Sequence, residues 1–200
     1  MDSPDSSQPP TSVRLAARLM LAYALVSALA AATAGLARQH LDSAGRAYLK
    51  LIGAVDHDAA NQLISDVRWD LTFHLVVSIA GVLVVGGLSI AVRRPMKVAR
   101  IAATAAAVVL AGLLGLVLIG SPETLTTPGE QDPPALRAAL NDLLLGGYPT
   151  ITSVLTVAAV GLSVAYTVFL FRDGASDLYR GSRADGEVGL WNYVPKSDRS

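Results

Sequence analysis

The stretch LTFHLVVSIAGVLVVGGLSIAVRRPMKVAR, residues 71–100, places four cations and a proline directly after a long apolar run. Between Leu71 and Val92 the only ionisable side chain is His74. At 1.5 Å per residue, a helix of this length spans the roughly 30 Å hydrocarbon core of a bilayer. The stretch therefore predicts a membrane-spanning helix that ends at a charged boundary.

Three further runs have the same character, because residues 19–37, 101–121 and 149–171 contain no charged side chain. Only 16% of all residues are charged and the mean hydropathy is +0.46, whereas soluble domains carry about 25% charged residues. The sequence predicts an all-α polytopic membrane protein: four transmembrane helices in an antiparallel bundle with short outer amphipathic helices. The predicted spans are residues 15–37, 71–92, 98–120 and 150–171.

The distribution of cations predicts the orientation of the chain. Arg93, Arg94, Lys97 and Arg100 form a short hinge between the second and third spans, where Pro95 breaks the helix. Loops rich in Lys and Arg stay in the cytoplasm, so both termini are predicted inside, with residues 38–70 and 121–149 outside. The same cluster could bind anionic lipid headgroups. The excess of Arg over Lys in an Ala- and Gly-rich chain suggests a bacterial inner membrane.

The N-terminal region allows two interpretations. Arg14, Arg18 and the small residues of ALAAATAGLA resemble a signal peptide, whose cleavage would leave three helices. The apolar run is longer than the usual core of a signal peptide, and an acidic, Pro/Ser-rich segment precedes it. We therefore expect residues 1–12 to form a disordered cytoplasmic tail and the first span to be retained.

The first outer segment, residues 38–70, repeats apolar residues at helical spacing. It predicts a helical excursion that lies on the bilayer or rises above it, with Asp58 as the N-cap of the second helix and Trp69 as an interfacial anchor.

The second outer segment predicts a short amphipathic helix that rests in the outer interface or covers the bundle. Asp132 would cap it and Gly146–Gly147 would end it. Its apolar stripe consists of Leu136, Leu140, Leu143 and Leu144.

The C-terminal tail, residues 172–200, is polar and Gly-containing, which predicts a disordered cytoplasmic segment. Its end carries the aromatic stretch VGLWNYVP, residues 188–195. Leu190, Trp191 and Tyr193 could anchor a partner or dip into the headgroup region.

Small residues at every fourth position allow helices to approach closely in lipid. Such faces would hold the bundle together or bind another membrane protein. They consist of Ser27, Ala31 and Gly35 in the first span, Ala103, Ala107, Ala111 and Gly115 in the third, and Gly161 and Ala165 in the fourth.

One group of side chains carries candidate chemistry. Asp66, Asp70 and His74 share a helical face, where they could bind a divalent cation or sense pH, or simply be solvated boundary residues. The chain has no cysteine, which excludes disulfides and thiolate metal sites. It has no Gly-rich phosphate loop, H-E-x-x-H or G-x-S-x-G motif either. We expect no catalytic residue, no cofactor and no nucleic-acid partner.

The spans contain many association surfaces and no charge near mid-membrane. This pattern favours an accessory or scaffold subunit that acts through helix packing and binds another membrane protein or itself. One alternative is a transport or channel component that functions as a homo-oligomer, and another is the outer-face sensor of pH or metal. The pore of such an oligomer would be lined by Ser78, Ser89, Thr104, Thr156, Ser163 and Thr167.

Overall fold

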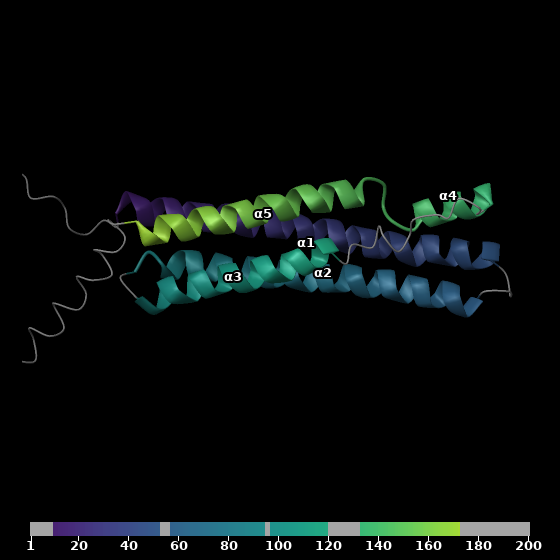
Figure 1. Cartoon of the computed structure of the whole chain (residues 1–200), viewed down its shortest axis with the longest axis horizontal. Coiled ribbons are helices and arrows are strands. Elements are labelled where there is room, and N and C mark those ends of the chain that lie inside the picture. Colours follow the sequence, from purple (N-terminus) through teal and green to yellow (C-terminus); the bar gives the residue numbers. More distant parts are fainter. Residues whose placement is uncertain (1–9, 53–56, 95–96, 120–132, 173–200) are drawn as a thin grey trace, which may run out of the picture.

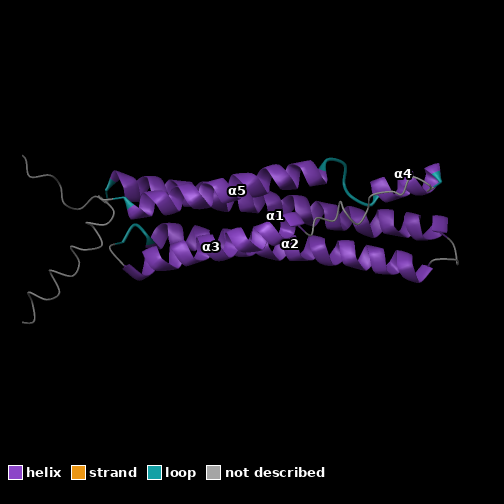
Figure 2. Cartoon of the chain, viewed as in Figure 1, coloured by secondary structure: helices purple, strands orange, loops and turns teal. Residues whose placement is uncertain are grey.

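The computed structural model describes residues 10–52, 57–94, 97–119 and 133–172. In this part of the chain, helices joined by turns are the only regular elements, and no strand is present (Figure 2). The predicted all-α class with four long apolar helices is confirmed. The five helices are α1 (Thr11–Ile52), α2 (His57–Ala91), α3 (Lys97–Ile119), α4 (Pro134–Asp142) and α5 (Tyr148–Phe171).

Four of these helices are long and apolar enough to cross a membrane: α1, α2, α3 and α5. With 23 and 24 residues, α3 and α5 each match one crossing. The 42 residues of α1 and the 35 of α2 are too many for the bilayer alone, because they extend about 63 Å and 52 Å. The chain is a multi-pass membrane protein in which two helices continue well beyond the bilayer.

The four long helices form one bundle (Figure 1). Helix α1 packs along α2 and α5, and α3 completes the bundle by packing on the same two helices. The start of α1, the end of α5 and the α2–α3 turn lie at one end, while α4 and the far ends of α1 and α2 lie at the other (Figure 1). Helices α2 and α5 are therefore diagonal partners, since each packs on both α1 and α3.

The turn between α2 and α3 begins earlier than the proline alone requires. Helix α2 ends at Ala91, and the amide of Arg94 donates to the Ala91 carbonyl at 3.1 Å. Helix α3 resumes at Lys97. Pro95, the predicted breaker, lies outside the described residues.

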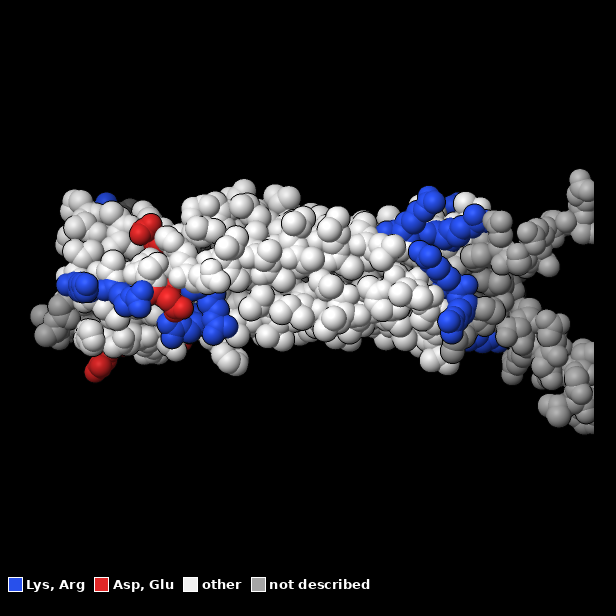
Figure 3. Space-filling model, turned by 180° about the vertical axis from the view of Figure 1, so that it is seen from behind, with Lys and Arg blue, Asp and Glu red and all other residues white. Residues whose placement is uncertain are grey.

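The outer face of the spans is apolar, as a lipid-facing surface requires. Leu25, Leu83, Val108 and Val157 are 63–69% exposed. Charged side chains gather toward the two ends of the molecule and leave its middle free of them in Figure 3. The core of the spans contains fully buried side chains from all four helices, among them Met20, Tyr23, Val85, Ala103 and Tyr166.

Gly81 sets the closest approach between α1 and α2. A Cβ atom at Gly81 would lie 2.9 Å from Ser27 Oγ and 3.3 Å from Tyr23 Cε1. Helix α2 can therefore approach α1 this closely only because residue 81 has no side chain.

The predicted small-residue faces coincide only in part with the interfaces within the chain. Ser27, Ala103 and Ala107 are buried between helices. Gly161 is exposed, and Ala31, Gly35, Ala111, Gly115 and Ala165 are half-buried. A Cβ atom at Gly35, Gly115 or Gly161 would meet nothing within 4 Å. Four residues of an α-helix turn about 40° more than one full rotation. Residues spaced strictly by four therefore rotate gradually away from the neighbouring helix. Helix α1 instead buries Ala30, Ala34 and Ala37, and contact of the remaining residues with another chain stays a prediction.

We predict that Gly81→Leu destabilises the bundle by about 1–3 kcal/mol, because the new side chain overlaps Ser27 and Tyr23. Gly87→Leu is the matched control, since a Cβ atom there meets nothing within 4 Å. Thermal unfolding in detergent measures both. Equal midpoints for the two variants would contradict the role given to Gly81.

Candidate functional site

The most distinctive surface is formed by the helices beyond the bilayer, which we call the outer platform after the orientation that the cations predict. It comprises residues 38–52 of α1, residues 57–70 of α2, and α4 with residues 143–145. Helices α1 and α2 enter it without a break, so they rise from the bundle, as one of the two predicted arrangements requires (Figure 1). Helix α2 begins at His57, so Asp58 lies in its first turn instead of preceding it as the predicted N-cap.

The outer platform has its own apolar core, which explains why its helices stay paired in water. Leu41, Val67 and Leu143 are fully buried there, and Tyr48 and Ile64 nearly so. A Cβ atom at Gly45 would lie 3.3 Å from Ile64 Cδ1. Outside the bilayer, burial of this surface from water stabilises the assembly by roughly 25 cal/mol per Å².

Helix α4 lies on α1, and its apolar side faces inward as predicted. It ends at Asp142, earlier than the predicted Gly146–Gly147 pair. Gly147 instead precedes α5 with a φ of 78°, a left-handed conformation that glycine adopts without steric cost. The glycine that was expected to end α4 is thus the residue immediately before α5. Asp132, the predicted cap of α4, lies outside the described residues.

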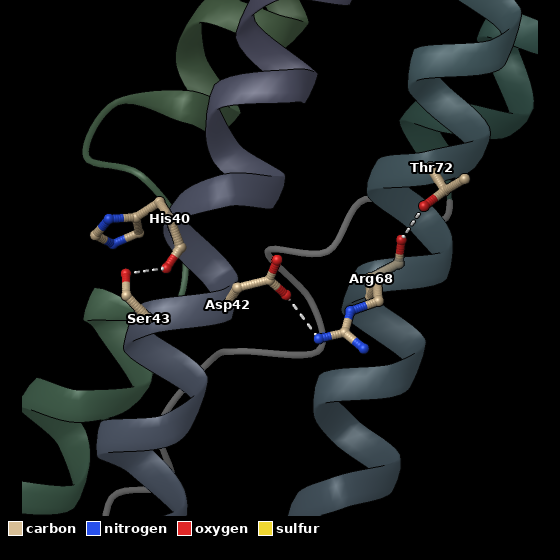
Figure 4. A network of polar contacts seen from close by, with 5 residues as sticks. All are labelled: His40, Asp42, Ser43, Arg68 and Thr72. Atoms are coloured by element: carbon tan, nitrogen blue, oxygen red, sulfur yellow. Dashed lines mark hydrogen bonds and ion pairs between the residues drawn. The ribbon is translucent and has the colours of Figure 1, made fainter.

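Two polar contacts connect the three helices of the outer platform. Arg68 Nη2 donates to Asp42 Oδ1 at 2.7 Å, joining α2 to α1 (Figure 4). His40 Nε2 lies 2.7 Å from the backbone oxygen of Asp142. A carbonyl only accepts, so His40 is the donor, and it satisfies one of the free carbonyls at the end of α4. The ion pair is half exposed and contributes at most about 1 kcal/mol.

An apolar groove of about 560 Å³ opens at the tip of the outer platform. All three helices contribute to it, so it forms only when α4 is docked on the α1–α2 pair. Its lining consists of Tyr48, Leu51, Ile52, Ala59, Ala60, Leu63, Pro133, Ala135 and Leu136.

The predicted constellation of Asp66, Asp70 and His74 does not converge on one point. Asp66 is exposed, Asp70 is half-buried, and His74 is 2% exposed in the bundle. Within the described ranges, no three His, Asp or Glu side chains are grouped closely enough to hold a metal ion. Burial of the three side chains therefore increases along α2, from the exposed Asp66 to the buried His74.

His74 has a partner that the sequence analysis missed. Its Nδ1 lies 2.9 Å from the hydroxyl of Tyr148, the first residue of α5, and this hydrogen bond is buried. The two rings meet edge to face at 6.3 Å. The bond crosses the centre of the bundle between its diagonal helices. A tyrosine at the first turn of an apolar span is the only sequence signal for it, and such residues are common interface anchors.

The remaining predicted site residues lie at the edges of the bundle. Trp69 is 72% exposed next to the outer end of the spans. Arg93, Arg94 and Lys97 are exposed at the other end, and the Arg100 guanidinium lies 4.1 Å from the centre of the Phe171 ring. Leu190, Trp191 and Tyr193 lie outside the described residues.

Comparisons with known protein families, with curated proteins and with solved structures find no match to this chain. The assignment of a function therefore depends on the geometry of the chain itself.

We predict that Leu143→Ala lowers the free energy of local opening of α4 by about 2–5 kcal/mol, because it leaves a cavity under that helix. Leu51→Ala is the control, since Leu51 is 56% exposed. Hydrogen exchange of residues 134–142 measures both variants. Unchanged protection in Leu143→Ala would contradict the docking of α4 through this leucine.

His40→Ala should weaken the same docking by about 1 kcal/mol, because the Asp142 carbonyl loses its donor. Amides of residues 134–142 should then exchange about fivefold faster. The exposed His57 offers the control His57→Ala. If both variants exchange alike, the bond from His40 does not hold α4 in place.

Proposed function

We propose that the protein is an accessory or scaffold subunit of a bacterial inner-membrane complex, with no chemistry of its own. Its outer platform would hold a partner protein above the bilayer. One observation carries the proposal: three separate chain segments build an apolar groove at the tip of the outer platform. Apolar grooves exposed to water commonly mark sites of protein interaction.

The height of the groove argues for a protein occupant instead of lipid. The uncharged part of α1 ends at Ala37, and that of α2 begins at Leu71. Tyr48 lies 11 residues beyond Ala37, and Leu63 lies 8 residues before Leu71, which places the groove about 12–16 Å or more above the hydrocarbon. The headgroup layer is only about 5–8 Å thick on each side. Acyl chains therefore do not reach the groove.

The size of the groove fits a few apolar side chains of a partner. Its volume of about 560 Å³ is within the usual range of binding pockets. Leu51, 56% exposed on its wall, is the most exposed of the large apolar side chains that line it. We propose that a helix or loop of a membrane-anchored partner inserts its apolar residues here.

The charge distribution supports the orientation that this proposal needs. Arg93, Arg94, Lys97 and Arg100 lie around the α2–α3 turn, and Arg14 and Arg172 lie at the same end. Cation-rich ends face the cytoplasm, which would place both termini inside and the outer platform outside. The same cations could hold anionic headgroups.

A pore between identical copies is less well supported. Of the residues expected to line it, Ser78, Ser89, Thr156 and Ser163 are buried in the bundle of a single chain. Thr104 and Thr167 are half-buried and donate to their own helix backbones. This placement favours the scaffold proposal, and the homo-oligomeric channel stays a prediction.

The test is purification from native membranes under mild conditions, followed by the mass of the intact complex. We expect the wild type to carry a stoichiometric second protein and Leu51→Glu to retain less than a tenth of it, because a buried charge in the groove is costly. Gln62→Glu is the control, since Gln62 is exposed on α2 and does not line the groove. Retention of the partner by Leu51→Glu, or a wild type that purifies only with itself, would overturn the proposal.

A further inference from the structure

We propose that the outer half of the bundle binds a row of internal water molecules that connects the outer surface to mid-membrane. The site is the buried region where the diagonal helices α2 and α5 meet through His74 and Tyr148. This inference concerns the interior of the spans and is independent of the groove on the outer platform.

Each of these two helices carries a row of polar side chains that descends from the outer end of the spans. Helix α2 contributes Asp70, His74 and Ser78, and α5 contributes Tyr148 and two threonines, Thr152 and Thr156, with four-residue spacing in both helices. Both helices run from the outer end to the other end, so the two rows descend together. The hydrogen bond between His74 and Tyr148 fixes their relative height. Apart from Asp70, which is half-buried, all of these residues are at most 7% exposed.

Most of these side chains carry a buried polar atom without a hydrogen-bond partner among the described residues. These atoms are Asp70 Oδ2, His74 Nε2, Ser78 Oγ, Thr152 Oγ1 and Thr156 Oγ1, with the Tyr166 hydroxyl deeper on α5. A polar group left unpaired in an apolar interior costs several kcal/mol. Because five such atoms follow one another along the two helices, we infer that one kind of ligand forms hydrogen bonds with all of them.

Other hydroxyls of the membrane spans show that this lack of a partner is not a general property of the chain. Serine and threonine in a helix can donate to the carbonyl three or four residues earlier. Thr72, Thr104 and Thr167 do so at 2.7–3.1 Å. Ser78, Thr152 and Thr156 do not, although all three are buried in the bundle.

Water is the ligand that fits these atoms. A buried water forms about three hydrogen bonds and satisfies donors and acceptors alike. The row offers a carboxylate oxygen, an imidazole nitrogen and three hydroxyls, a mixture that no single ion would select. The half-buried Asp70 gives the row its opening to the outer solution.

Toward the other end of the bundle, the buried serines of α2 and α5 have backbone partners and offer no further site for water. Ser89 donates to the Gly86 carbonyl at 2.6 Å, and Ser163 donates to the Val160 carbonyl at 2.7 Å. The fully buried Met20, Val85 and Leu170 fill that end of the core. Thr156 lies eight residues along α5 from Tyr148, so water would penetrate about 12 Å along the helix. His74 would then exchange protons with the outer solution only.

Water-edited solid-state NMR of the protein in bilayers tests the inference directly. We expect Ser78, Thr152 and Thr156 to receive magnetisation from water at least threefold faster than Val157, which lies beside Thr156 and is 66% exposed on the lipid-facing side. Equal, slow transfer to Thr156 and Val157 would overturn the proposal, whatever the outer platform binds.

Thr156→Val removes a hydroxyl while keeping the shape of the side chain. Because neighbouring waters lose a partner, transfer to Thr152 and Ser78 should fall at least twofold. Thr104→Val is the matched control, since the Thr104 hydroxyl already donates to the Arg100 carbonyl. An equal effect of the two substitutions would show that the row holds no connected water. The wild-type measurement stands even if Thr156→Val folds poorly.

Discussion

The hydrocarbon layer of the bilayer cannot solvate a peptide group or a charge, and the rest of the structure depends on this constraint. Each backbone that crosses it must satisfy its own hydrogen bonds, which only a helix does within one segment. The constraint explains the four uncharged runs, the position of the charged side chains at the two ends of the molecule and the apolar exterior of the spans (Figure 3). It also makes the buried hydroxyls of the interior expensive, so their arrangement carries more information than it would in a soluble bundle.

Two different forces hold the two halves of the molecule together. In the spans, lipid competes equally for apolar side chains, and close backbone contact such as Gly81 against Ser27 has to supply the attraction. In the outer platform, water surrounds the same two helices and burial of Leu41, Val67 and Leu143 supplies it. Helices α1 and α2 therefore pass from lipid to water without a break. Near Ala37 the interaction that holds them together changes from close backbone contact to burial of apolar side chains.

The four long apolar helices could be predicted because charge-free length is a strong signal and depends on no other part of the chain. The packing of the helices could not be predicted, because a series of small residues does not show which face of a helix meets which neighbour. In α1, Ala30 and Ala34 are buried, whereas Ala31 and Gly35 were expected to be. The role of Gly147 depends on a backbone angle that the sequence leaves open. The bond between His74 and Tyr148 joins residues 74 positions apart, and single-residue patterns carry no information about such pairs.

The unequal lengths of the helices have a mechanical consequence. Because α1 and α2 are continuous, the outer platform is a rigid lever attached to two of the four spans, while α3 and α5 stop at the bilayer. A 10° change in the tilt of that pair would displace a tip about 20 Å above the bilayer by about 3–4 Å. A protein seated at the tip would be carried with it, so bilayer thickness or curvature could be transmitted to the partner as a displacement.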